Sequence, residues 1–224
     1  MREPVRAFAF DLDETLTDCE AQHVAATRAM LDLTGVEAAG VRDVFHDATG
    51  KRTRDLVEAY RVASGVAHSL DELLALRHAA FLQALDDEPA RPRPGALDLL
   101  AACRALGPVA LVTSGHREDA LATLESLGAT RFFTAIVTGE DVERPKPDPE
   151  PYRVAASRMN VAPRDALAFE DSPRGVASAK AAGFLVVAVP NPRSTRPEQV
   201  READITLREP AEALPLDALL ARLS

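Results

Sequence analysis

The sequence has few cysteines and few aromatic residues, and it has no tryptophan. Two widely spaced cysteines, Cys19 and Cys103, do not make a disulfide framework or a zinc site. Aromatic residues account for 4% of the 224 residues, whereas hydrophobic residues as a whole account for 46%. We therefore expect an ordered protein whose core is packed with small aliphatic side chains, with Cys103 buried in a helix.

Long hydrophobic runs and an excess of positive charge are also missing. The longest late apolar run, residues 184–189, is far too short to span a bilayer, and the residues before Asp11 lack the apolar segment of a signal peptide. With 35 acidic and 26 basic residues, the formal net charge is −9, which disfavours nucleic acid and anionic membranes as partners. We expect a cytoplasmic protein, a monomer or weak homodimer, that attracts an anionic substrate with a local positive group such as a metal ion.

The apolar pattern divides the chain into two kinds of structure. Residues 5–10 form a short apolar run that stops at an aspartate and predicts a buried strand. Residues 18–90 show only the helical spacing of apolar residues, and Ser69 followed by Glu72 is typical of a capped helix start. The segment EPARPRPG at residues 88–95 then indicates a linker.

From residue 95 onward, helical and strand patterns alternate, which is typical of a parallel, doubly wound sheet with right-handed crossovers. The expected strands cover residues 109–113, 135–138, 166–170 and 185–189, and the expected helices cover residues 96–106, 117–127, 151–159 and 174–182. We expect residues 1–17 and 93–224 to form a Rossmann-like α/β core domain. Residues 18–92 would be inserted into it as an all-helical cap domain.

Polar side chains follow four of the expected strands. They are Asp11 and Asp13 after the first, Thr113 and Ser114 with the adjacent Gly115 backbone after the next, then Lys146, and finally Glu170 and Asp171. Because ligands of open α/β sheets bind at the carboxyl ends of the strands, we expect these groups to converge. Carboxylates this close need a counter-charge, and all-oxygen ligands favour Mg²⁺, whereas the lysine and hydroxyls suit a phosphoryl group. Asp171 would complete the metal site, and Glu170 would either join it or orient Lys146.

The residue types at this edge suggest a division of roles. The Asp11 carboxylate would attack phosphorus and form an aspartyl-phosphate. Asp13 would protonate the leaving alkoxide and later deprotonate the attacking water. The Thr113 hydroxyl and the Ser114 backbone N–H would hold phosphoryl oxygens, while Lys146 would pair with the nucleophile and with the developing charge.

Four segments resemble the motifs of the haloacid dehalogenase superfamily of phosphohydrolases. They are DLDETLTD at 11–18, LVTSG at 111–115, RPKPDPEPY at 144–152 and FEDSPRG at 169–175, so that the match covers nearly the whole chain. The resemblance implies that Asp11 is the nucleophile, that Asp13 is the acid/base, and that Thr113 and Lys146 bind the phosphate. It also implies a metal ion held by Asp11, by the backbone carbonyl of Asp13 and by Asp171.

The helical insert looks like the cap of the phosphoglycolate phosphatase and β-phosphoglucomutase branch of that superfamily. His23 and Arg77 would then lie on the cap and contribute to substrate binding, with a helix-capping or surface role as the alternative. Three positions depart from the branch. Glu14 stands where glycine is usual, Thr17 where an apolar residue is commoner, and Cys19 where the mutases tend to carry a hydroxyl residue.

The leading prediction is therefore a Mg²⁺-dependent phosphatase that acts on a small phosphorylated metabolite. The first alternative is a β-phosphoglucomutase-type sugar-phosphate mutase, which would use the same phosphorylated Asp11 but exclude water until a second hydroxyl arrives. Another alternative is a non-enzymatic phospho-receiver, which would need no helical cap, so the predicted cap argues against it. A dehalogenase of the superfamily would need no metal and would lack the second aspartate, Asp13.

Overall fold

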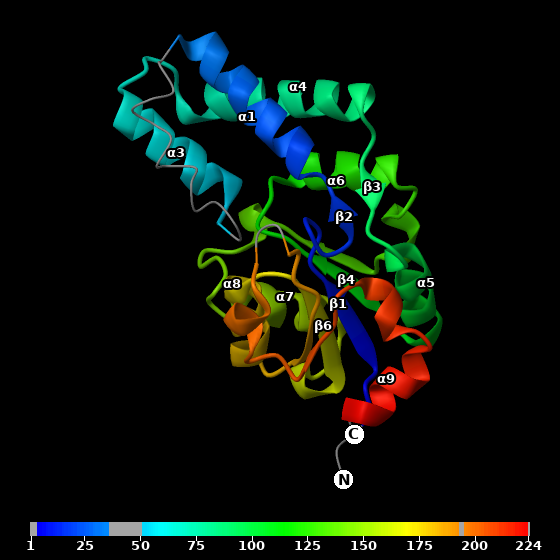
Figure 1. Cartoon of the computed structure of the whole chain (residues 1–224). Helices are drawn as coiled ribbons and strands as arrows, with labels where there is room; N and C mark the ends of the chain where they lie inside the picture. Colours follow the sequence, from blue (N-terminus) through cyan, green and yellow to red (C-terminus); the bar gives the residue numbers. More distant parts are fainter. Residues whose placement is uncertain (1–3, 36–50, 193–194, 224) are drawn as a thin grey trace.

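The computed structural model describes residues 4–35, 51–192 and 195–223. Its core is a six-stranded sheet with the strand order β5-β4-β1-β6-β7-β8, in which every neighbouring pair runs parallel (Figure 1). The strands are β1 (Ala7–Phe10), β4 (Val109–Val112), β5 (Ala135–Val137), β6 (Ala166–Glu170), β7 (Leu185–Ala188) and β8 (Ile205–Thr206). The predicted doubly wound parallel sheet is confirmed, and β4, β1 and β6 are consecutive in it.

Helices cover both faces of the sheet. One face carries α5 (Ala96–Leu106), α6 (Arg117–Ser126) and α9 (Leu216–Leu223), and the other carries α7 (Glu150–Met159) and α8 (Pro173–Ala182). Because side chains alternate along a strand, Phe8 and Phe10 of β1 pack with the first set, whereas Ala7 and Ala9 pack with the second. With both faces buried, the functional groups of the sheet gather at the ends of its strands.

Three helices form a separate layer over one end of the sheet, which we refer to as the cap (Figure 1). They are α1 (Glu20–Thr34), α3 (Thr53–Ser64) and α4 (Leu70–Asp87). Met30, Tyr60 and Leu73 are fully buried between them. The Ser69 side chain accepts a hydrogen bond from the Glu72 backbone N–H at 3.2 Å, which confirms the predicted capping box of α4.

A short antiparallel ladder connects the cap with the core. It consists of β2 (Thr17–Asp18) and β3 (Arg91–Pro92). The predicted divisions of the chain, after residues 17 and 92, fall on this ladder, and residues 36–50 of the predicted cap range lie outside the described residues. Sequence patterns predict neither the ladder nor β8 and α9, because strands of two residues carry no periodicity and prolines interrupt the chain after residue 189.

The remaining connections contain short 3-10 helices. These lie at Thr130–Phe132, Gly139–Asp141, Pro163–Asp165, Pro197–Val200 and Pro210–Ala213. Among the helices of the described residues, none is long and apolar enough to cross a membrane. Both cysteines are buried and free.

Candidate active site

Lys146 joins the carboxyl ends of three consecutive strands. Its Nζ lies 2.7 Å from Asp11 Oδ1, 2.9 Å from the Val112 carbonyl oxygen and 2.5 Å from Glu170 Oε1. These partners end or follow β1, β4 and β6, although Asp11 and Lys146 are 135 residues apart in the chain. The ammonium group therefore fixes the Asp11 carboxylate at the edge of the sheet, where the sequence places the nucleophile.

The charges in this cluster do not balance. Burial acts against the charge of Lys146, but attraction to Asp11 and Glu170 outweighs it and raises the pKa of the lysine. Burial raises the pKa of Asp11 well above its usual range, and the charge of Lys146 offsets this only in part. Burial and then repulsion from Asp11 and Glu170 raise the pKa of Asp171 in the same way. Three carboxylates share one ammonium group, so the site favours an additional cation.

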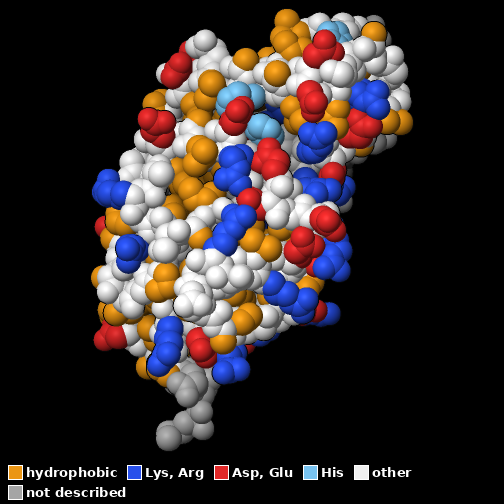
Figure 2. Space-filling view, turned by 180° about the vertical axis from the view of Figure 1, so that it is seen from behind, with side chains coloured by type: hydrophobic (Ala, Val, Ile, Leu, Met, Phe, Trp, Pro, Cys, Tyr) orange, Lys and Arg blue, Asp and Glu red, His pale blue; other side chains and the backbone are white. Residues whose placement is uncertain are grey.

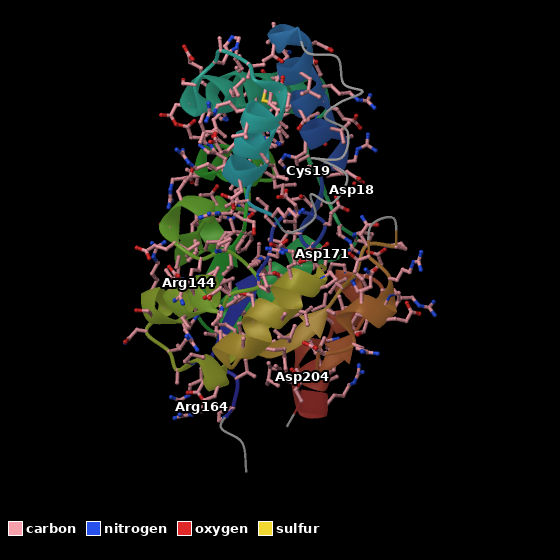
Figure 3. The ribbon with its side chains drawn as sticks, turned by 90° about the vertical axis from the view of Figure 1, so that its left-hand side faces the viewer. Asp18, Cys19, Arg144, Arg164, Asp171 and Asp204 are labelled. Carbon is pink, nitrogen blue, oxygen red and sulfur yellow. The ribbon has the colours of Figure 1, made fainter. Side chains whose placement is uncertain are left out.

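Asp11, Glu170 and Asp171 each offer a carboxylate oxygen within 4.8 Å of the others, so this all-oxygen cluster can hold a metal ion. Figure 3 shows Asp171 at the end of the sheet that faces the cap. Glu170, however, is already held by donors. Its Oε1 accepts from the Tyr152 hydroxyl at 2.7 Å as well as from the lysine, and its Oε2 accepts from the Ser172 hydroxyl at 3.2 Å. The geometry therefore favours Asp11 and Asp171 as the metal ligands, whereas Glu170 positions Lys146.

The start of α8 is shaped around the Glu170 side chain. Ser172 caps the helix, because its hydroxyl oxygen accepts a hydrogen bond from the Gly175 backbone N–H at 3.0 Å. A Cβ atom on Gly175 would lie 1.9 Å from Glu170 Cδ, so only glycine leaves room for the carboxylate beneath the first turn. The sequence SPRG that follows Glu170 and Asp171 thus serves both to begin the helix and to seat this side chain.

Asp13 is held from the cap side. Its Oδ1 lies 3.0 Å from His23 Nε2 and accepts from Cys19 Sγ at 3.1 Å. Arg77 Nη2 donates to His23 Nδ1 at 2.9 Å, so the second ring nitrogen, Nε2, carries the proton that is donated to Asp13. Burial acts to raise the pKa of Asp13, but the facing His23 outweighs it and lowers the pKa overall.

In the structure, the two cap residues predicted to bind substrate, His23 and Arg77, contact other side chains of the protein. Arg77 is buried, with 6% of its surface exposed, and its Nη1 donates to Asp119 Oδ2 at 2.6 Å. His23 stacks on Phe81 with ring centroids 4.6 Å apart. This geometry favours a role in positioning Asp13, and direct contact of His23 or Arg77 with a substrate stays a prediction.

The loop after β4 places a hydroxyl beside a glycine that faces Asp13. Thr113 Oγ1 accepts a hydrogen bond from the Gly115 backbone N–H at 2.9 Å, and Ser114 lies in the turn between them. A Cβ atom on Gly115 would lie 3.2 Å from Thr113 Oγ1 and 3.8 Å from Asp13 Oδ2. The glycine therefore keeps open the space between the hydroxyl and the carboxylate, where a phosphoryl oxygen can be received.

Tyr152 escapes sequence reasoning, and the sequence marks Glu14 only as a departure from the usual glycine. Tyr152 is fully buried and donates to Glu170, and its position within the segment RPKPDPEPY was the available signal. Glu14 has a φ of 64°, a left-handed conformation that favours glycine, so its departure from the usual residue is tolerated at a cost of about 1–2 kcal/mol. Burial raises the pKa of the Glu14 carboxyl to about 7, and Asn191 contacts it.

A model of the haloacid dehalogenase-like hydrolase family matches residues 5–183, and the chain belongs to this family. The validoxylamine A 7'-phosphate phosphatase of Streptomyces hygroscopicus subsp. limoneus is 37% identical over 205 residues, which cover 91% of this chain and 93% of that protein. Hexitol phosphatase A of Escherichia coli (strain K12) is 32% identical over 90% of both chains. The crystal structure of CbbY from Rhodobacter sphaeroides in complex with phosphate, at 26% identity, has a TM-score of 0.84 and covers 96% of this chain and 99% of that chain.

Proposed function

We propose that this protein hydrolyses the phosphomonoester of a small metabolite in the presence of Mg²⁺, through a phosphorylated Asp11. The observation that carries the proposal is the buried cluster in which Lys146 holds Asp11 beside Asp171, with more carboxylate charge than one lysine neutralises. Relatives that align with 90% or more of the chain are phosphatases of phosphorylated small molecules, which supports the same chemistry.

The donor set of the cluster fits a magnesium ion, because all of its candidate ligand atoms are oxygens. The side chains of Asp11 and Asp171 and the backbone carbonyl of Asp13 would hold the ion. When bound, it would neutralise repulsion between the attacking carboxylate and the anionic substrate. Glu170 as a ligand is the less favoured arrangement, since both of its oxygens already accept hydrogen bonds.

The residues of the chain supply the remaining chemistry. A carboxylate oxygen of Asp11 bonds to phosphorus while the bond from phosphorus to the ester oxygen breaks, and Asp13 gives the departing oxygen a proton. Asp13 then takes a proton from water, whose oxygen attacks the same phosphorus and releases inorganic phosphate and free Asp11. Lys146 and the loop from Thr113 to Gly115 stabilise the phosphoryl oxygens through both steps.

A panel of phosphorylated metabolites, including phosphoglycolate, hexose phosphates and nucleotide monophosphates, tests this function. We expect phosphate release from at least one class, complete loss of the activity in EDTA, and recovery on adding Mg²⁺. Incubation with β-glucose 1-phosphate and a bisphosphate primer should yield phosphate without isomerised sugar. Isomerised sugar without phosphate release would identify a mutase instead, and activity undiminished by EDTA would contradict the metal requirement. The cytoplasmic location and the monomeric or weakly dimeric state stay predictions.

Replacing Glu170 with glutamine distinguishes a metal ligand from a group that holds the lysine. The amide keeps the shape of the side chain and one acceptor oxygen for Lys146 and Tyr152. It loses the second acceptor, which faces Ser172, and one of the two charges that pair with Lys146. We expect kcat to fall by about 10–100-fold, while the Mg²⁺ concentration for half-maximal activity changes by less than about threefold. In the matched variant Asp171→Asn, that concentration should rise at least about tenfold. A comparable rise in Glu170→Gln would make Glu170 a ligand.

A further inference from the structure

A second group of possible metal ligands lies outside the candidate active site, where the cap meets the core. It consists of His78 on α4, His116 directly before α6, and Asp119 within α6. Each offers one ligand atom, and these atoms lie within 4.8 Å of one another. Histidine side chains lie beside one another, next to acidic side chains, in the upper part of the face shown in Figure 2. The group therefore joins two elements that belong to different layers of the molecule.

His116 presents a buried nitrogen that has no partner within residues 4–35, 51–192 and 195–223. Its Nε2 lies 2.9 Å from Glu140 Oε1, and because a carboxylate only accepts, Nε2 carries the proton. The lone pair is then on Nδ1, which is buried and makes no hydrogen bond among those residues. A histidine whose far nitrogen donates to a carboxylate while its other nitrogen is free has the arrangement found in metal-binding histidines.

His78 lies between two carboxylates. Its Nδ1 is 2.6 Å from Asp119 Oδ1, and its Nε2 is 3.3 Å from Glu118 Oε2. In the neutral imidazole, which carries one proton, the second nitrogen faces a carboxylate oxygen without a proton to donate to it. A metal ion bonded to His78 Nδ1 and Asp119 Oδ1 would take the place of that proton. The second oxygen, Asp119 Oδ2, accepts from Arg77 at 2.6 Å, which leaves Oδ1 for the cation.

The charge and the ligand types agree with this reading. Three carboxylates, from Glu118, Asp119 and Glu140, face the group, and the guanidinium of Arg77 opposes them. Two imidazole nitrogens and one carboxylate oxygen form a ligand set typical of zinc. Bonds of about 2.1 Å in a tetrahedral site separate ligand atoms by about 3.4 Å. The 2.6 Å between His78 Nδ1 and Asp119 Oδ1 would therefore widen on binding, and the ligand atoms of all three residues already lie within 4.8 Å of one another.

We propose that His78, His116 and Asp119 form a zinc site that bridges the cap helix α4 and the core helix α6. Glu118 or a water molecule would complete the tetrahedron. Arg77 of α4 already contacts Asp119 of α6 across the same junction, and zinc would add further bonds between the two layers. A capped enzyme must open to exchange substrate and product, so an occupied zinc site would slow turnover. The proposed site shares no residue with the cluster of Asp11, Glu170 and Asp171, although Arg77 connects Asp119 with His23. Zinc binding can be measured whether or not the proposed phosphatase activity is correct.

Cobalt and zinc binding to the full-length protein tests the site, with saturating Mg²⁺ present to fill the carboxylate cluster. We expect one Co²⁺ per chain to give the visible absorption of a tetrahedral site and one Zn²⁺ to displace it. At zinc a hundredfold above its Kd, the Tm should rise by about 5 °C or more. His116→Gln and His78→Gln should each weaken Zn²⁺ binding by at least about tenfold. The control His68→Gln, which removes a partly exposed histidine just before α4, should bind as the wild type does.

Absence of the cobalt spectrum in the wild type, or zinc binding that persists unchanged in both His116→Gln and His78→Gln, would overturn the proposal. Activity separates this site from zinc that displaces Mg²⁺. Inhibition through the bridge should resist excess Mg²⁺ and disappear in His116→Gln, whereas inhibition at the carboxylate cluster should be relieved by Mg²⁺ and persist in that variant. If no phosphatase activity is found, the spectrum and the Tm still decide the question.

Discussion

Replacing Asp11 with asparagine is expected to lower kcat for phosphomonoester hydrolysis by about 10⁴-fold or more. The amide has the same shape and can still accept the hydrogen bond that Lys146 Nζ donates at 2.7 Å, so the site should keep its geometry. The amide lacks the carboxylate that forms the bond to phosphorus, so the first step has no nucleophile. Phosphate release measures the loss, and acid quenching with labelled substrate should trap a phosphorylated protein from the wild type and none from Asp11→Asn.

The control for this variant makes the same chemical change on the surface. Asp98 lies in the first turn of α5 and is exposed, so Asp98→Asn should keep kcat within about twofold of the wild type. Phosphate release by Asp11→Asn within tenfold of the wild type would remove Asp11 from the nucleophile role. A labelled protein that still forms in Asp11→Asn would place the phosphoryl group on another residue.

The sequence predicts which functional groups form the site better than it predicts the contacts that hold them in place. Apolar runs locate the parallel strands well, and the carboxyl ends of such strands meet at one edge of a sheet. The sequence therefore predicts that Asp11, Lys146 and Glu170 lie close together. The contact of Lys146 with the Val112 carbonyl and the seating of Glu170 under Gly175 are different. They depend on rotamers and on the start of α8, which leave no periodic signal in the chain.

The cap illustrates the same limit at a larger scale. Helical spacing predicts α4, and the Ser69 capping box fixes where it begins. Which face of α4 meets the core depends on how two separately packed layers dock through the ladder of β2 and β3. The sequence therefore predicts Arg77 as a substrate contact, whereas in the structure its guanidinium donates hydrogen bonds to His23 and Asp119.

Replacing Lys146 with methionine is expected to lower kcat by about 10³-fold, because the proposed donor to the phosphoryl group is lost while an unbranched side chain one atom shorter fills most of its space. The substitution also leaves Asp11 and Glu170 buried without their shared counter-charge, which should cost about 3 kcal/mol in the free energy of unfolding at neutral pH. Urea unfolding in EDTA measures this cost without a contribution from added metal. The control Lys180→Met removes a partly exposed lysine that pairs with Asp204, so it should cost less than about 1 kcal/mol and leave kcat unchanged.

The stability loss in Lys146→Met should depend on pH in a defined direction. Burial already raises the pKa of Asp11 in the wild type, and without the lysine nothing offsets that effect. The folded variant then holds protons that the unfolded chain releases, so its free energy of unfolding falls as the pH rises above the ordinary carboxyl range. The difference from the wild type should be small near pH 4 and larger at pH 8. A pH-independent difference would mean that Lys146 stabilises the fold through packing alone, and a kcat within tenfold of the wild type would exclude it from the reaction.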